Sequence, residues 1–95
     1  MIVERTTHKV KQGCMQELVA FLKGFTESGG LTVRIYTDNI GPRFTVASEE
    51  EFESLAEREK LRAQRRASPD WSAFAEKYYA LAETGGTIEI WDLVD

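Results

Sequence analysis

The sequence predicts a small α+β domain, and two observations carry that prediction. Apolar residues alternate over several segments, as in half-buried strands, and recur every third or fourth position over others, as in amphipathic helices. Clusters of glycine, proline and asparagine fall between these segments, where turns are expected. The 95 residues, 42% of them hydrophobic, suffice for one domain spanning residues 1–95, which would bury about 60 to 65% of its unfolded surface. Pairing with a second copy would supply additional core.

The first part of the chain is expected to form strand, helix and strand. Residues Ile2–Val10 are rich in β-branched side chains, which favour a strand. Helical spacing of apolar residues covers Gly13–Ser28, and the two glycines that follow are typical of a helix end. Alternation then predicts a strand over Leu31–Tyr36. The segment Asp-Asn-Ile-Gly-Pro after it is a turn by composition.

The second part is expected to form strand, broken helix and strand. A strand over Arg43–Ala47 is followed by Ser48, which with Glu51 has capping-box spacing and predicts a helix start. The helix continues through a charged run and is interrupted at a Ser-Pro pair that opens a second helical segment, whose apolar face is Trp71, Phe74, Ala75, Tyr78 and Ala82. Two glycines at 85 and 86 are expected to end that helix before a last strand, Thr87–Val94.

This order matches the ferredoxin-like β-α-β-β-α-β motif, with a four-stranded antiparallel sheet and the helices on one face. The apolar side chains expected beneath the helices are Leu31, Val33, Ile35, Phe44, Val46, Ile88 and Ile90. The opposite, open face is expected to carry Arg34, Tyr36, Arg43, Thr45, Ala47, Glu89, Trp91 and Leu93. Arginine and aromatic residues are enriched at protein interfaces, so we interpret the open face as a homodimer surface.

Net charge, hydropathy and cysteine content restrict the possible partners, cofactors and cellular location of the protein. A net charge of −4 argues against a nucleic-acid ligand. No apolar run approaches the roughly 20 residues that span a bilayer, so no membrane partner is expected. One cysteine excludes an internal disulfide, and no Cys and His residues have zinc-ligand spacing, which favours a cytoplasmic protein without a metal or other cofactor. Cys14 itself continues a helical apolar stripe and is expected in the core.

Three segments together resemble the dimeric α/β-barrel superfamily, and within it the NIPSNAP-like and antibiotic-biosynthesis-monooxygenase-like proteins. They are Glu4–Gly13 running into Gln16-Glu17-Leu18, Gly41–Val46 running into Glu51–Leu55, and Ser68-Pro69-Asp70-Trp71 before the aromatic helix. The resemblance spans nearly the whole chain. First strands of NIPSNAP-like proteins usually read Glu-x-Arg-x-Tyr, whereas this sequence has Glu4, Thr6 and His8 in that register, so no role of the missing arginine and tyrosine is carried over.

The resemblance implies a dimer of ferredoxin-like subunits, each with a small-molecule pocket between sheet and helices. The superfamily includes cofactor-free oxygenases, ester- and lactone-processing enzymes, haem-degrading proteins and members without assigned activity. Membership therefore implies a pocket without fixing a reaction.

The polar residues of the first strand are the best candidates for chemistry. Glu4, Thr6 and His8 share one side of the strand, and if that side faces the helices they line an otherwise apolar cavity. His8 is the candidate catalytic acid or base, because a histidine can move a proton near neutral pH. A structural histidine, hydrogen-bonded to its neighbours, is the alternative. Haem ligation by His8 is a further alternative.

Candidate substrate-binding residues are Thr6, Trp71, Tyr78 and Arg43. Trp71 and Tyr78 could form an aromatic wall, although core packing explains them as well. Arg34 and Arg43 could bind an anionic substrate or pair with Glu89 across a subunit interface. The charged run over Glu57–Arg66 alternates in sign and is expected to be a solvated helix face.

The leading hypothesis is therefore a homodimer that binds a small apolar or aromatic ligand, with cofactor-independent oxygenation or proton transfer as its chemistry if it is an enzyme. The rival hypothesis is a non-catalytic interaction scaffold, in which the charged helix engages another protein. The two differ in one structural expectation: a pocket-based function requires a cavity of about 300 Å³ or more that Thr6 or His8 reaches, whereas a scaffold has filled packing beneath the helices.

Overall fold

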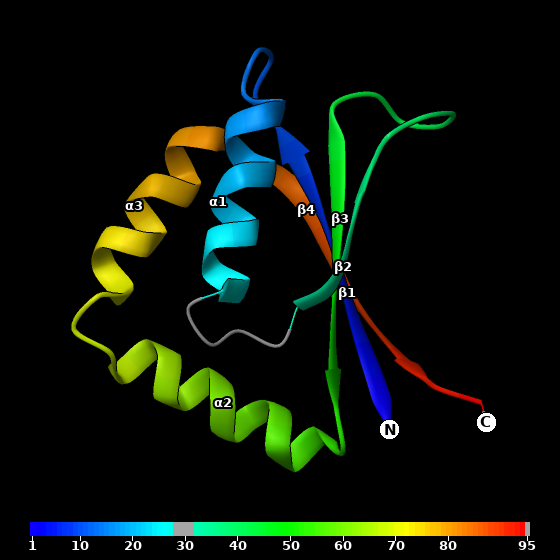
Figure 1. Ribbon diagram of the computed structural model, residues 1–95, viewed down its shortest axis with the longest axis vertical. Helices are drawn as coiled ribbons and strands as arrows, with labels where there is room; N and C mark the ends of the chain where they lie inside the picture. The colour runs from blue at the N-terminus through cyan, green and yellow to red at the C-terminus, as the bar shows by residue number, and fades with distance from the viewer. Residues whose placement is uncertain (28–31, 95) are drawn as a thin grey trace.

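The computed structural model describes residues 1–27 and 32–94 and consists of one sheet layer and one helix layer. Figure 1 shows the sheet nearly edge-on, with the three helices on one side of it. The elements are β1 Ile2–Val10, α1 Met15–Glu27, β2 Thr32–Thr37, β3 Thr45–Phe52, α2 Leu55–Ala67, α3 Trp71–Leu81 and β4 Ala82–Asp92. This is the expected ferredoxin-like α+β fold.

The sheet has the order β2-β3-β1-β4, and all neighbouring strands are antiparallel. Residues paired directly across strands project from the same face of a sheet. Thr6 of β1 is paired with Ser48 of β3 and with Ile88 of β4, so all three lie on one face. Because β1 is central, the polar positions of this strand lie in the middle of the sheet.

The apolar core lies between α1, α3 and the helix-covered face of the sheet. Its buried cluster consists of Val10, Leu18, Leu22, Val46 and Leu81. Leu18 and Val46 are completely inaccessible to solvent. Cys14 and Ile35 pack against this cluster, as their positions in the sequence predict.

The predicted helix start at Ser48 is wrong. β3 continues to Phe52, because residues 48–52 pair with the first half of β1 and Phe52 lies opposite Ile2. The Ser-x-x-Glu spacing recurs six residues later, and there it does begin a helix: the side chain of Ser54 accepts a hydrogen bond from the backbone N–H of Glu57 at 3.2 Å. Both segments have the same Ser-x-x-Glu spacing, and strand pairing determines which of the two begins a helix.

The two glycines near the end of the chain do not end a helix, which also corrects the prediction. α3 stops at Leu81 and β4 begins at once, so both glycines lie inside a strand. The register against β1 shifts between Thr7 and Lys9 at this place. Gly85 has φ +102°, and a Cβ atom on Gly86 would lie 2.5 Å from the carbonyl oxygen of Thr7. The glycines therefore permit a bulge and a close approach of two strands.

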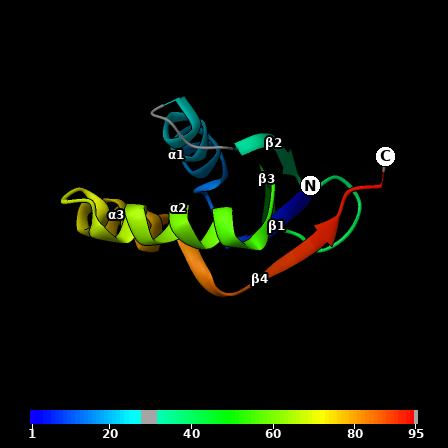
Figure 2. The same ribbon diagram turned by 90° about the horizontal axis from the view of Figure 1, so that it is seen from below.

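The predicted sheet faces are confirmed where the structure describes them, with two exceptions. The exceptions are Phe44 and Arg43, which precede β3 and belong to the turn. Leu31 and the side chain of Val33 lie outside the described residues. Ile88 and Ile90 are on the helix side but 53% and 39% exposed. Figure 2 shows the reason, since β4 runs away from the helices towards the C-terminus. Among the described residues, no helix is long and apolar enough to cross a membrane.

Candidate functional site

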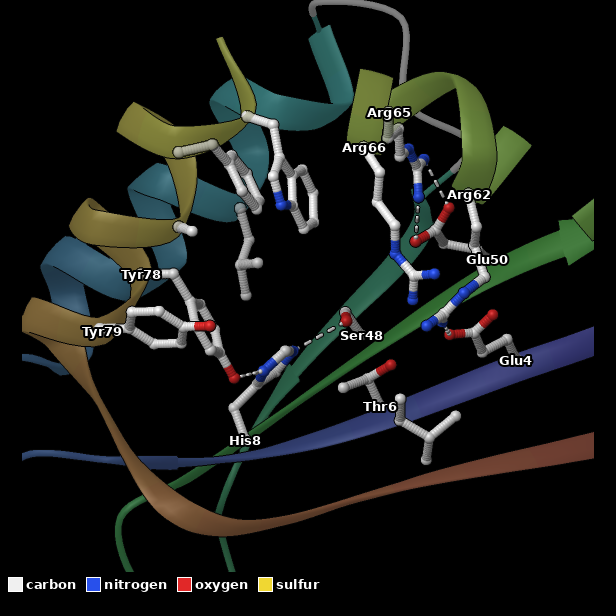
Figure 3. A pocket seen from close by; sticks show the side chains of 15 residues that line it. Glu4, Thr6, His8, Ser48, Glu50, Arg62, Arg65, Arg66, Tyr78 and Tyr79 are labelled. Carbon is white, nitrogen blue, oxygen red and sulfur yellow. Dashed lines mark hydrogen bonds and ion pairs between the residues drawn. The ribbon is translucent and has the colours of Figure 1, made fainter. Parts of the chain in front are cut away.

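A cavity of about 290 Å³ lies between the sheet and the helices, mainly beneath α2 and α3 (Figure 3). Strands supply one wall and helices the other, so residues far apart in sequence converge on it. The lining residues are Glu4, Thr6, His8, Leu22, Ser48, Glu50, Arg62, Arg65, Arg66, Trp71, Phe74, Ala75, Tyr78, Tyr79 and Ile88.

Among the described titratable residues that line the cavity and form no ion pair, His8 is the most buried. Its side chain is 6% exposed, its Nδ1 lies 2.6 Å from the hydroxyl oxygen of Tyr78, and its Nε2 lies 3.1 Å from Oγ of Ser48. Burial lowers the pKa of His8 from 6.5 to about 4. At neutral pH the imidazole is therefore neutral, with one nitrogen donating a hydrogen bond and the other accepting one.

Tyr78 and Ser48 make His8 the middle member of a three-residue hydrogen-bonded chain. Burial, and secondarily the neighbouring Tyr79, raises the pKa of Tyr78, so its phenol stays protonated near neutral pH. In one tautomer Tyr78 donates to Nδ1 and Nε2 donates to Ser48; in the other, both bonds are reversed. A proton can move along such a chain without any rearrangement of the backbone.

Ion pairs join α2 to the sheet beside the cavity. The Arg58 guanidinium donates to Glu4 at 2.6 Å, and Arg65 makes two bonds to Glu50 at 2.8 and 3.3 Å. The side chains of Arg58 and Arg65 are only 13% and 19% exposed. The expectation that this charged run is a solvated helix face is thus wrong for Arg58 and Arg65, although Lys60 and Arg66 are exposed.

Stacked aromatic rings form much of the α3 wall. The rings of Trp71 and Phe74 stack with centroids 5.5 Å apart, and Phe74 lies 4.8 Å from Phe21 of α1. Trp71 remains 37% exposed, so it borders the cavity rather than filling it. This wall offers a flat apolar surface of the kind that binds rings.

The structure brings together four of the five residues that the sequence singled out. Thr6, His8, Trp71 and Tyr78 all line the cavity. Arg43 does not: it lies in the turn before β3, with its guanidinium carbon 5.3 Å from the ring centroid of Phe44. Its expected role in substrate binding has no support from its position.

Sequence reasoning also placed Glu4 at the cavity but missed the other polar lining residues. Ser48 was placed at a helix start, and the cavity-lining arginines of α2 were assigned to solvent. The spacing of Arg62, Arg65 and Arg66, at i, i+3 and i+4, was the available signal, because it puts all three on one helix face.

The open sheet face carries a second polar network, around Glu49. This carboxylate is 5% exposed and accepts hydrogen bonds from Arg34 at 2.8 Å, Arg5 at 2.7 and 3.0 Å, and Tyr36 at 2.9 Å. These donors, Arg34 first, lower the pKa of Glu49 to about 2. Arg34 also pairs with Glu51 of the same subunit.

The described residues contain no group of three or more His, Cys, Asp or Glu side chains that could hold a metal ion. Both ring nitrogens of His8 are engaged by neighbours, so neither is free to bind a haem iron.

Comparison with known proteins identifies the family. A family model described as NIPSNAP matches residues 3–86. The chain belongs to the NIPSNAP family. Among curated proteins, none matches it.

Solved structures agree with that membership. A NIPSNAP family protein with unknown function from Agrobacterium tumefaciens is 26% identical, with a TM-score of 0.81 over 95% of this chain and 85% of that chain. An uncharacterized NIPSNAP domain protein from Burkholderia xenovorans is 18% identical, with a TM-score of 0.86 over 99% and 95%. An antibiotic biosynthesis monooxygenase is 15% identical, with a TM-score of 0.68 over the full length of both chains. The suspected superfamily and its ferredoxin-like fold are confirmed.

Proposed function

We propose that this NIPSNAP protein binds a small molecule in the cavity and removes a proton from it, with His8 as the base and Tyr78 as the intermediate carrier. The observation that carries this proposal is the buried, neutral His8 hydrogen-bonded to a tyrosine hydroxyl that lines the same cavity. A cavity of about 290 Å³ is close to the lower limit of about 300 Å³ for ligand pockets. A pure scaffold would instead be expected to have filled packing beneath α2 and α3.

The proton transfer follows from the hydrogen-bonded chain. A hydroxyl group of the ligand gives its proton to the phenol oxygen of Tyr78, while the Tyr78 proton moves to Nδ1 of His8. The products are an anionic ligand and an imidazolium whose Nε2–H donates to Ser48. A pKa of about 4 makes free His8 a weak base, but the adjacent ligand anion stabilises the imidazolium and raises that pKa while the ligand is bound.

Ionisation of a phenol or enol is also the first step by which a substrate becomes reactive towards oxygen without a cofactor. A structural neighbour named as a monooxygenase makes oxygenation a reasonable continuation of this step. The residues at the cavity supply ligand binding and deprotonation.

A homodimer formed through the open sheet face completes the proposal. Large hydrophobic side chains are exposed there, including Trp91 at 53%, Leu93 at 47% and Tyr36 at 42%. Glu49 is already paired within its own subunit, so a partner could cover this carboxylate without leaving it unpaired. Sedimentation velocity should give twice the chain mass at micromolar concentration, and Trp91→Asp should shift the protein towards monomer; a wild-type monomer at all concentrations would refute the dimer.

A chromogenic phenol tests the proton transfer without knowledge of the natural ligand. 4-Nitrophenol absorbs at longer wavelength when ionised, so a titration of the bound probe reports its apparent pKa. We expect that value to be lower in the wild-type protein than in His8→Phe, which keeps a ring but has no base. Equal values in the two proteins would eliminate His8 as the base, and absence of binding to either would refute the cavity as a ligand site.

A further inference from the structure

The α2 side of the cavity carries more positive charge than its carboxylates neutralise. Three arginines and two glutamates line the cavity, so its lining has one net positive charge within a chain of net charge −4. Of the two glutamates, Glu50 is bonded twice by Arg65 and Glu4 is bonded by Arg58, which does not line the cavity. Both carboxylates thus already have close partners.

Arg62 and Arg66 retain unused hydrogen-bond donors. The nearest carboxylate contact of Arg62 is 4.0 Å, to Glu4, which is well beyond the 2.7–2.9 Å typical of a charge-assisted bond. The Arg66 side chain has no hydrogen bond or ion pair with any residue in 1–27 or 32–94. Figure 3 shows both guanidinium groups turned into the cavity, on the side opposite His8 and Tyr78.

The charges and the apolar wall together define a ligand. The same cavity is lined by the stacked aromatic rings of Trp71 and Phe74. A guanidinium group binds a planar carboxylate through two parallel hydrogen bonds. An aromatic ring suits the wall, and a hydroxyl group suits Tyr78.

We propose that the ligand is an aromatic hydroxy acid of one or two rings, with its carboxylate at Arg66 and Arg62 and its hydroxyl at Tyr78. This inference rests on the proposed function and names its substrate class. It replaces the purely apolar or aromatic ligand expected from the sequence. The charges balance at each stage: the excess arginine charge offsets the carboxylate, and the imidazolium formed at His8 offsets the second negative charge produced by deprotonation.

Two matched probes test the carboxylate site. 2-Naphthoate and 2-naphthamide have nearly the same shape and differ in charge. Each is titrated into the full-length protein at low salt by isothermal calorimetry, and binding in the cavity is located by the NMR signal of the Trp71 indole N–H, with Trp91 as the internal reference. We expect 2-naphthoate to bind about tenfold more tightly, as a charge-assisted pair in a partly exposed site allows, and the preference to shrink at high salt.

Three variants assign that preference to a residue. Arg66→Gln should reduce it to less than about twofold, whereas Arg66→Lys should keep most of it because the charge remains. Lys60→Gln removes one positive charge from the solvent side of α2 and should leave the preference unchanged, which controls for net charge. Retention of the full preference in Arg66→Gln would overturn the assignment to Arg66.

The same titrations separate the two proposals. Equal binding of both probes at Trp71 in the wild-type protein would refute an anionic ligand and leave the cavity as a binding site. Absence of binding by both probes, together with no binding of 4-nitrophenol, would refute the ligand site itself and with it the inference drawn from it.

Discussion

Burial of His8 as a neutral imidazole should make the stability of this protein depend on pH in a defined window. The folded-state pKa is about 4, below the ordinary value of 6.5. Between these two values the unfolded chain takes up a proton that the folded chain does not, so the free energy of unfolding decreases as the pH falls from 6.5 towards 4. Each pH unit in that window is worth about 1.4 kcal/mol, and the whole window therefore amounts to about 3 kcal/mol.

The measurement is urea denaturation of the wild-type protein and of His8→Gln at a series of pH values from 7.5 to 4.5. Subtraction of the two curves removes the contributions of the other titrating groups. We expect the wild-type protein to lose about 2 kcal/mol more than the variant between pH 7 and pH 5. Glu49 does not interfere, because its pKa of about 2 lies below an ordinary value of 4.5, so its contribution is lost only below that window. Parallel curves for the two proteins would show that the pKa of His8 is not lowered, and would refute both its burial as a neutral group and the proton transfer built on it.

Two further predictions concern the elements that hold the cavity. Replacing Gly86 with Ala should destabilise the protein by at least about 1 kcal/mol, because the new Cβ would meet the Thr7 carbonyl oxygen at 2.5 Å; an unchanged melting temperature would show that β1 and β4 do not approach so closely. Arg58→Ala should destabilise by about 2 kcal/mol, since it leaves the nearly buried Glu4 without its closest partner, whereas Lys60→Ala on the same helix should have almost no effect in the same denaturation assay.

Periodicity was sufficient to predict the number, type and order of the elements, because each follows from which side chains must be buried. It was insufficient wherever two local signals were equivalent. Ser48 and Ser54 both precede a glutamate by three residues, and only the pairing of β3 with β1 places the first inside a strand. The glycines at 85 and 86 satisfy the rule for a helix end as well as the rule for a bulge. Such choices are decided by contacts distant in sequence.

The candidate site was predictable in part for the same reason. Alternation along β1 places Thr6 and His8 on one side whatever the rest of the chain does, and helical spacing does the same for Trp71 and Tyr78. Whether a charged helix faces water or a cavity depends on how the helix docks, which the alternation of charge sign does not reveal. Arg62 and Arg66 therefore became candidates only when the position of α2 over the sheet was known.

The polar side chains at the centre of this sheet argue for selection by function rather than by stability. Glu4, Thr6 and His8 occupy helix-facing positions of the central strand, where apolar residues would pack and add core to a chain of only 95 residues. At these positions the buried polar atoms need hydrogen-bond partners. Arginine from α2 supplies them for Glu4, and hydroxyl groups from β3 and α3 supply them for His8. Replacing a buried polar network of this kind with well-packed apolar residues is often neutral or stabilising. Retention of three such residues around an open cavity, with two arginine side chains still available to a ligand, is best explained if the cavity is where the protein acts.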